Sequence, residues 1–449
     1  MRGFAEPLVA EALLDAVVGW PEWCHRRVDS IHPQVGERGR VRHSIDCTPP
    51  PDVRLAYLPD ERDRRRIDDL QGPVIVPLAI TAKGPMRQLD ASVDGAPLPL
   101  LSLAENSALG VAMLEHALRG VPRVDPATAR EALLGVVGPA LPGRRAPEAV
   151  ARELVDQGTF AGRPVWDARD VDPEVAALMM DLSRGFLLCG LVPSEHAGTR
   201  RLLKLAFHWR IEKSTPGGGR LHERVACGLG WASRSIELPM TAPGYSASYH
   251  LEFQTPAELD CVRLELPADH GLQPGALDVS GQPVAHAHAA FPEPPAGSAQ
   301  VHLHVPARGI WLHAALSAFV TAVVMWLAIG LPGATVTLMG RPDGAAALLL
   351  GIPAVLISLA AGRGENALSA WMLAPVRAFM LACSAGLVAV AASMVGQLHE
   401  PWRAVLWWVV AVAASVLLVA MLVSPVVRRS LPAVGVSRYA SSTDEGSVT

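Results

Sequence analysis

Two pairs of histidines are the residues of this chain whose type and spacing best suit a chemical function, namely metal binding. His286 and His288 form one His-x-His pair, and His302 with His304 forms another. Residues two apart on a strand point to the same side, so four imidazoles on two neighbouring strands could converge as ligands of a transition metal. No carboxylate stands at ligand spacing beside them. We therefore expect that the four histidines lie on the solvent-facing side of an edge strand and do not converge, and we favour this interpretation over a metal site.

Other catalytic patterns fail at a defining position. His222-Glu223 begins like the zinc motif H-E-x-x-H, but Ala226 stands where the second histidine must follow one helical turn later. The glycine triplet 217–219 has no Lys-Ser or Lys-Thr after it, so it is typical of a loop and not of a phosphate cradle. The sequence therefore predicts no catalytic residue and no cofactor, and favours a non-enzymatic protein. The alternative is a membrane-anchored enzyme with a site between the helical and β parts of its head.

The last third of the chain contains four apolar runs, whereas the long region before them contains none. The runs cover residues 310–331, 344–361, 376–396 and 405–425. Each is about 20 residues long, which as a helix crosses roughly 30 Å of hydrocarbon. We expect an all-α four-helix transmembrane bundle over residues 308–427. A transport component is a third interpretation, but only His313 and Arg377 are ionisable within the runs.

Arginines beside these runs predict the orientation. The group expected at the cytoplasmic ends comprises Arg308, Arg363, Arg377, Arg428 and Arg429, whereas the two remaining connections hold only Arg341 and Arg403. Basic residues are enriched on the cytoplasmic side. Near the amino terminus, Glu6, Glu11 and Asp15 interrupt the apolar core that a secretory signal needs. We therefore expect a multi-pass protein of the bacterial cell (inner) membrane with both termini in the cytoplasm.

The six cysteines contain no C-x-x-C pair and no tight spacing. In a cytoplasmic head they are expected to be reduced and partly buried. If the head lay outside the cell, Cys227 and Cys261 would become a candidate disulfide.

The connection between the second and third runs is the most specific part of the membrane region. It reads Arg363-Gly364-Glu365-Asn366-Ala367-Leu368 and continues through Trp371 to Arg377. With this segment, the chain resembles a group of uncharacterised actinobacterial four-span membrane proteins that have a soluble amino-terminal region, although Asn366 stands where histidine is expected. The resemblance covers mainly residues 200–430 and implies no activity. We expect a structural elbow here, and possible interaction residues are Arg363, Glu365, Trp371 and Arg377.

The region before the membrane is predicted to be α+β. A mixed α/β unit at 1–102 includes a hairpin turn at Asp94-Gly95, and a helical subdomain or insertion follows at 103–199, beginning with the capping box of Ser102 and Glu105. Strand patterns at 200–307 predict an antiparallel β-sandwich next to the membrane. The sequence leaves one alternative open, in which the strands of 40–101 join the 200–307 sheet. Residues 428–449 are predicted to be a disordered cytoplasmic tail.

Composition limits the partners. The net charge is only −4, so no overall field favours nucleic acid. The expected partners are the lipid bilayer and a protein, either a different one or a second copy bound through the transmembrane helices.

Overall fold

The computed structural model describes most of the chain. The described ranges are 7–34, 38–51, 73–84, 86–139, 143, 145–210, 221–239, 246–266, 284–289, 298–331, 333, 366–430 and the single positions 344, 347, 349, 351 and 355. These residues fall into two compact units. The head unit comprises Met1–Ser214, Ser235–Pro256 and Cys261–His302, and the membrane unit comprises Thr215–Arg234, Ala257–Asp260 and Leu303–Thr449.

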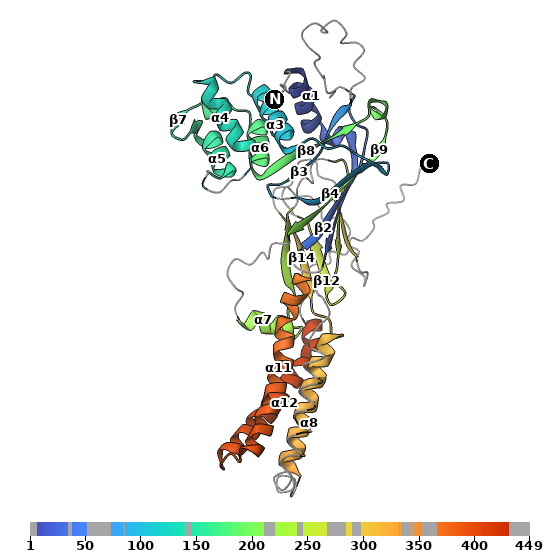
Figure 1. The fold of residues 1–449 in the computed structure, drawn as a ribbon, viewed down its shortest axis with the longest axis vertical. Helices are drawn as coiled ribbons and strands as arrows, with labels where there is room; N and C mark the ends of the chain where they lie inside the picture. Colours follow the sequence, from blue (N-terminus) through green and yellow to red (C-terminus); the bar gives the residue numbers. More distant parts are fainter. Residues whose placement is uncertain are drawn as a thin grey trace, which may run out of the picture. The chain divides into compact units, whose positions relative to one another are not determined.

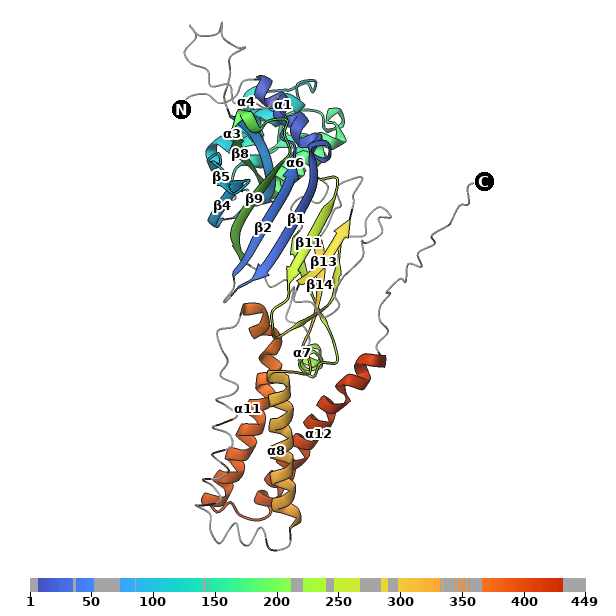
Figure 2. The ribbon, with the colours of Figure 1, turned by 90° about the vertical axis from the view of Figure 1, so that its right-hand side faces the viewer.

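A seven-stranded sheet organises the head unit (Figure 2). In spatial order its strands are β13 (Val284–Ala289), β11 (Tyr249–Gln254), β1 (Cys24–Pro33), β2 (Arg38–Cys47), β9 (Arg201–Arg210), β4 (Arg87–Val93) and β5 (Ala96–Pro97). The β1–β11 pair is parallel and the other pairs are antiparallel. Buried and solvent-facing side chains alternate along β1 and β11, as expected for a sheet with one wet face.

A second, two-stranded sheet carries the most apolar sequence of the head. It pairs β3 (Val74–Ala82) with β8 (Gly185–Val192), and residues 74–80 of β3 are all buried. Helices contact both strands (Figure 1), which explains why these strands read as continuous apolar runs and do not alternate.

The helices of the head that begin at Leu103, Pro126 and Pro173 each follow a side-chain cap. The helices described in the head are α1 (Pro7–Val18), α2 (Trp20–Trp23), α3 (Leu103–Ala117), α4 (Pro126–Val137), α5 (Pro147–Gln157) and α6 (Pro173–Arg184), with the short elements β6 (Thr159–Phe160), β7 (Arg163–Pro164), η3 (Ala168–Asp170) and η4 (Ser194–His196) between and after them. The predicted capping box is confirmed, because Ser102 accepts from the Glu105 amide and Glu105 accepts from the Ser102 amide. The predicted hairpin turn is confirmed as well. Asp94 and Gly95 connect β4 to β5 with φ values of 48° and 90°. Glycine adopts such a positive φ without strain, which suits Gly95 to this turn.

Three further strands form a separate sheet in the order β10 (Arg234–Pro239), β14 (Ser298–His304), β12 (Asp260–Glu265). The predicted boundary at residue 200 does not separate sheets, because β9, β11 and β13 join β1, β2 and β4 in the large sheet. The large sheet is mixed, since β1 and β11 run parallel although they lie far apart in sequence. The antiparallel β-sandwich at 200–307 stays a prediction.

Among its described residues, the membrane unit contains a short helix, α7 (Leu221–Gly228), and three long helices, α8 (Ile310–Gly330), α11 (Ala367–Val395) and α12 (Trp402–Ser430). Each long helix has the length and apolar composition to cross a membrane. They pack through a cluster of apolar residues that includes Met325, Leu387 and Trp407. The chain is therefore a membrane protein with a large head.

The predicted runs match these helices unevenly. Residues 310–331 correspond to α8, and 405–425 lie within α12. The third helix begins at Ala367 and not at 376, so the start was predicted too late. The range 344–361 lies largely outside the described residues; its five described positions are helical. Of the predicted tail, 431–449 also lie outside them.

Candidate functional site

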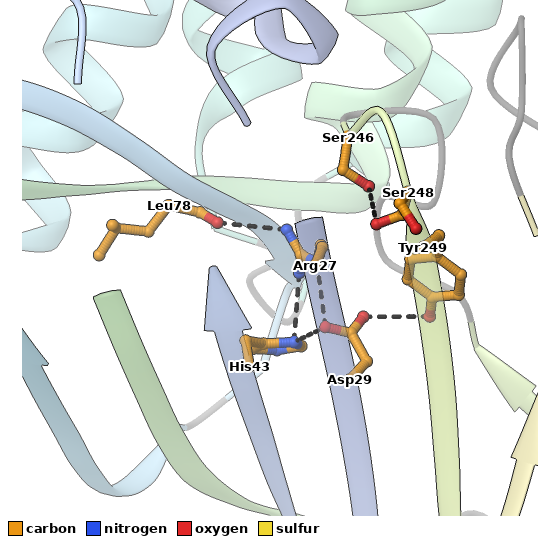
Figure 3. Close-up of polar contacts among 7 residues, drawn as sticks. All are labelled: Arg27, Asp29, His43, Leu78, Ser246, Ser248 and Tyr249. Atoms are coloured by element: carbon orange, nitrogen blue, oxygen red, sulfur yellow. Dashed lines mark hydrogen bonds and ion pairs between the residues drawn. The ribbon is translucent and has the colours of Figure 1, made fainter. Parts of the chain in front are cut away.

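A group of charged and polar side chains is buried inside the head unit (Figure 3). Arg27 and Asp29 are two apart on β1 and therefore share one face of the sheet. Strand pairing places His43 of β2 directly opposite Asp29, and Tyr249 of β11 beside Arg27. The four residues are only 0–4% exposed. We call them the buried network.

The Asp29 carboxylate is the centre of this network. Its Oδ1 lies 3.0 Å from Arg27 Nε and 2.5 Å from His43 Nδ1, and its Oδ2 accepts a 3.1 Å hydrogen bond from the Tyr249 hydroxyl. His43 Nδ1 also lies 3.2 Å from Arg27 Nη2. Because its contact with the carboxylate oxygen is much the shorter of the two, we assign the hydrogen of His43 to Nδ1, which donates to Asp29. The carboxylate therefore receives donors from three strands.

A β-bulge supplies the last partner of Arg27. The β3–β8 register shifts between Pro77 and Ala79, which leaves Leu78 outside the ladder. Arg27 Nη1 donates to the Leu78 carbonyl oxygen at 3.2 Å. The guanidinium thereby ties the large sheet to the two-stranded sheet.

The electrostatics follow from this arrangement. Burial by itself raises the pKa of the Asp29 carboxyl, but the charge of Arg27 and the hydrogen bonds from His43 and Arg27 together lower it well below its ordinary value. Burial, reinforced by the adjacent carboxylate, raises the pKa of Tyr249 well above its ordinary value. Asp29 is therefore ionised at neutral pH, and Tyr249 keeps its proton and donates it.

An aspartate that orients a histidine through Nδ1 is the arrangement of a general base, because Nε2 is then left to accept a proton. His43 Nε2 has no hydrogen-bond partner within the described part of the chain. However, the His43 ring is 2% exposed and packs on Phe207 with ring centroids 5.6 Å apart. No substrate can reach this nitrogen in the observed conformation, so the buried network joins β1, β2 and β11 inside the head and is not an accessible catalytic site.

The first predicted histidine pair lies on the opposite, solvent-facing side of the same sheet. His286 and His288 are on β13, where His288 stands opposite His250 of β11. The His250 Nδ1 atom is 3.0 Å from His286 Nε2, and the Ser248 hydroxyl lies 3.2 Å from His250 Nε2 and 3.1 Å from His288 Nε2. Sequence reasoning missed His250, since it has no histidine two residues away and only strand pairing brings it to the others.

Burial, together with the positive charges of Arg26, His288 and His286, lowers the pKa of His250 to about 4, and Glu252 opposes this shift. Both nitrogens of His250 already face partners. Among the described residues, no group of three or more histidine, cysteine, aspartate or glutamate side chains has the geometry to hold a metal ion.

The second predicted pair lies elsewhere, on β14 of the three-stranded sheet. His302 Nε2 is 3.5 Å from Glu265 Oε1, and His304 Nε2 is 3.2 Å from the Gly230 carbonyl oxygen. The structure thus brings His286 and His288 together with His250, and places His302 and His304 in a different sheet.

The outer face of the seven-stranded sheet carries an excess of basic groups around the three histidines. We define this outer basic face by its cations, Arg26, Arg40, Arg42 and Lys204, and by its imidazoles, His32, His208, His250, His286 and His288. Its carboxylates within the described strands are Asp46, Asp90 and Glu252. Asp46 is already matched by Arg200, which donates to both of its oxygens, and Glu252 accepts from Ser30 at 2.5 Å.

The predicted interaction residues of the membrane region have different surroundings. The Arg234 guanidinium lies 3.8 Å from the centroid of the Trp371 ring, within the range of a cation–π contact. Arg377 is partly buried on α11, while Arg363 and Glu365 lie outside the described residues. The α11 helix begins at the cap of Asn366, whose side chain accepts from the Ser369 amide at 2.7 Å, and it continues through Pro375, so the predicted elbow is a continuous helix in this part.

The end of α7 and the turn after it contact the three long helices described in the membrane unit. The Trp311 indole of α8 donates to the Leu229 carbonyl at 3.4 Å, and the Trp231 indole donates to the Ala420 carbonyl of α12 at 2.9 Å. Gly228 approaches α11 so closely that an added Cβ would lie 2.6 Å from the Pro375 Cβ. Only glycine fits at this position.

Comparison with known proteins adds no family. No protein-family model matches the chain, and no curated protein is found to be similar to it.

Proposed function

We propose that this protein is a non-enzymatic, multi-pass protein of the bacterial inner membrane whose cytoplasmic head binds an acidic protein partner through the outer basic face. The observation that carries the proposal is the concentration of basic side chains on one face of the head. The chain as a whole has a net charge of −4, yet exposed cations and imidazoles collect on one face of its largest sheet.

The side chains of this face can bind the carboxylates of an acidic partner. Arg26, Arg42 and Lys204 are exposed and stand on three different strands, so they present charge across the width of the sheet. The imidazoles and the Ser248 hydroxyl add hydrogen-bond donors between them. Charge complementarity of this kind speeds encounter and selects partners more than it adds affinity. We therefore expect fast, salt-sensitive binding.

The membrane unit localises this head. We propose that residues 344–361 form a further span, which makes four spans and puts both termini in the cytoplasm, as the arginine distribution predicts. Leu349 supports this, because it is 6% exposed and belongs to the apolar cluster of the long helices. We also propose that the lipid-facing helix surfaces associate with a partner or with a second copy. The proposed relatives are the actinobacterial four-span proteins that the 363–377 segment resembles.

The test uses the full-length protein in nanodiscs of phosphatidylcholine, which carries no net charge. A fluorescein-labelled peptide of twelve glutamates is the probe, and a matched peptide of glutamines is its neutral control. The variant Arg42→Gln/Lys204→Gln removes two cations from the outer basic face. The matched variant Arg152→Gln/Arg169→Gln removes two exposed cations from the helical part of the head.

The proposal predicts that the glutamate peptide binds and the glutamine peptide does not. Each exposed charge contributes roughly 0.2–1 kcal/mol, so the outer-face variant should weaken binding about 2- to 30-fold, while the helical variant binds like the wild type. Raising the salt concentration should weaken the wild-type complex. Equal weakening by both variants, or binding of neither peptide, would refute the assignment of this face.

A further inference from the structure

Two cysteines of the head stand directly opposite each other in the sheet. The β1–β2 register pairs Cys24 with Cys47. Beside this pair, the Thr48 amide donates to the Trp23 carbonyl at 2.8 Å, and the register shifts between Cys24 and Arg26. On its other side, the Cys24 carbonyl accepts from the Ala247 amide at 2.9 Å. Opposed residues of an antiparallel pair have Cα atoms about 4.5–5.5 Å apart, which falls within the roughly 4.4–6.8 Å that disulfides span.

Both thiols lie in the same buried environment. Cys24 and Cys47 are each 0% exposed, and both are free in this structure. Burial raises the pKa of the Cys47 thiol well above its ordinary value, and the neighbouring Cys24 adds to this shift. Burial likewise raises the pKa of Cys24 to about 12. Because only a thiolate attacks a disulfide, the folded pair is chemically inert, and reaction requires the strands to be open.

From this geometry we infer that Cys24 and Cys47 form a cross-strand disulfide whenever the head folds in an oxidising environment, and stay reduced when it folds in a reducing one. This pair differs from Cys227 and Cys261, which the sequence alone suggested. Its oxidation state records the compartment in which the head folded. The inference does not depend on the partner proposed for the outer basic face.

The oxidant can be a disulfide such as oxidised glutathione. One cysteine thiolate attacks glutathione disulfide, which forms a mixed disulfide and releases one reduced glutathione. The second cysteine thiolate then attacks the protein sulfur of the mixed disulfide and releases the other glutathione. The cysteines lose two electrons to glutathione disulfide, and their two protons end on the glutathione thiols.

The full-length protein is synthesised in a cell-free system with nanodiscs. One sample is made in an oxidising glutathione buffer and the other with dithiothreitol. The reaction is quenched with acid, free thiols are alkylated in denaturant, and peptides are analysed by mass spectrometry without reduction. The inference predicts a linked peptide pair containing Cys24 and Cys47, lighter by two hydrogen atoms than the sum of the free peptides, in the oxidising sample only.

Two controls define the pair. Cys24→Ser should leave Cys47 alkylated and unlinked in the oxidising sample. Cys189→Ser should leave the linked pair intact, since Cys189 is also buried and free but lies on β8. Recovery of both Cys24 and Cys47 as alkylated peptides from correctly folded oxidised protein, or linkage of Cys47 to several other cysteines in similar yield, would overturn the inference.

Discussion

Removing the charge of Asp29 should destabilise the head far more than removing the charge of a similar aspartate at the surface. Asp29→Asn leaves the Arg27 guanidinium buried without its anion. Loss of one partner of a buried ion pair costs about 3–5 kcal/mol. The matched control is Asp46→Asn on the paired strand β2. Asp46 accepts two hydrogen bonds from Arg200, but the Arg200 side chain is 67% exposed, and such surface pairs contribute only about 0–1 kcal/mol.

Native-state hydrogen exchange of the full-length protein in nanodiscs measures this difference where it arises. Peptides that cover β1 and β2 report the free energy of opening of these strands. Because about 1.4 kcal/mol corresponds to a tenfold change, Asp29→Asn should speed exchange there by about two to three and a half powers of ten, and Asp46→Asn by less than one. Similar protection in the two variants would refute a dominant role of the buried network.

The same variant makes a prediction about pH. The pKa of Asp29 is lower in the folded protein than in the unfolded chain, so its contribution is fully present above the ordinary carboxyl pKa of about 3.9 and is lost as the pH falls below that value. The stability gap between wild type and Asp29→Asn should therefore be constant from neutral pH to about pH 5 and narrow in stronger acid. A gap that widens below pH 4 would contradict the direction of the shift.

Three further outcomes follow from other contacts. Gly228→Ala should lower the thermal midpoint of the detergent-solubilised protein, since its new Cβ meets Pro375 at 2.6 Å and overpacking costs about 1–3 kcal/mol; an unchanged midpoint would show that the contact relaxes freely. A double-mutant cycle of Arg234→Met with Trp371→Leu should give a coupling energy of about 0.5–2 kcal/mol, and additive effects would exclude the cation–π contact. The folded pKa of His250, about 4, is below its unfolded value, so wild-type stability should fall as the pH drops from about 6.5 to 4, and His250→Gln should reduce that fall in chemical denaturation curves recorded across this range.

Local signals in the sequence predicted much of the fold. The cap of α3 and the Asp94-Gly95 turn depend on residues within four positions of each other, and the structure contains both. The length of the apolar runs likewise identified the three long helices that the structure describes. The start of α11 was missed because residues 367–375 were assigned to a connection, whereas the helix begins after the Asn366 cap and continues through Pro375.

The candidate sites depend on contacts that no local pattern contains. Arg27 and Asp29 stand in a polar stretch that suggests an exposed segment, and only the pairing of β1 with β2 and β11 reveals that they are buried. His250 joins His286 and His288 through pairing of β11 with β13. Such long-range register is fixed by burial of one sheet face, which a single sequence does not disclose.

Protease protection tests most directly the claim that a cytoplasmic head is held by the membrane-spanning helices. Protease is added to spheroplasts that contain the full-length protein, and to inverted membrane vesicles, and the head is followed with an antibody against the helical part of the head. The head should survive in spheroplasts and be digested in inverted vesicles. Digestion in spheroplasts, or recovery of the chain in the aqueous fraction without detergent, would contradict a cytoplasmic head held by membrane-spanning helices.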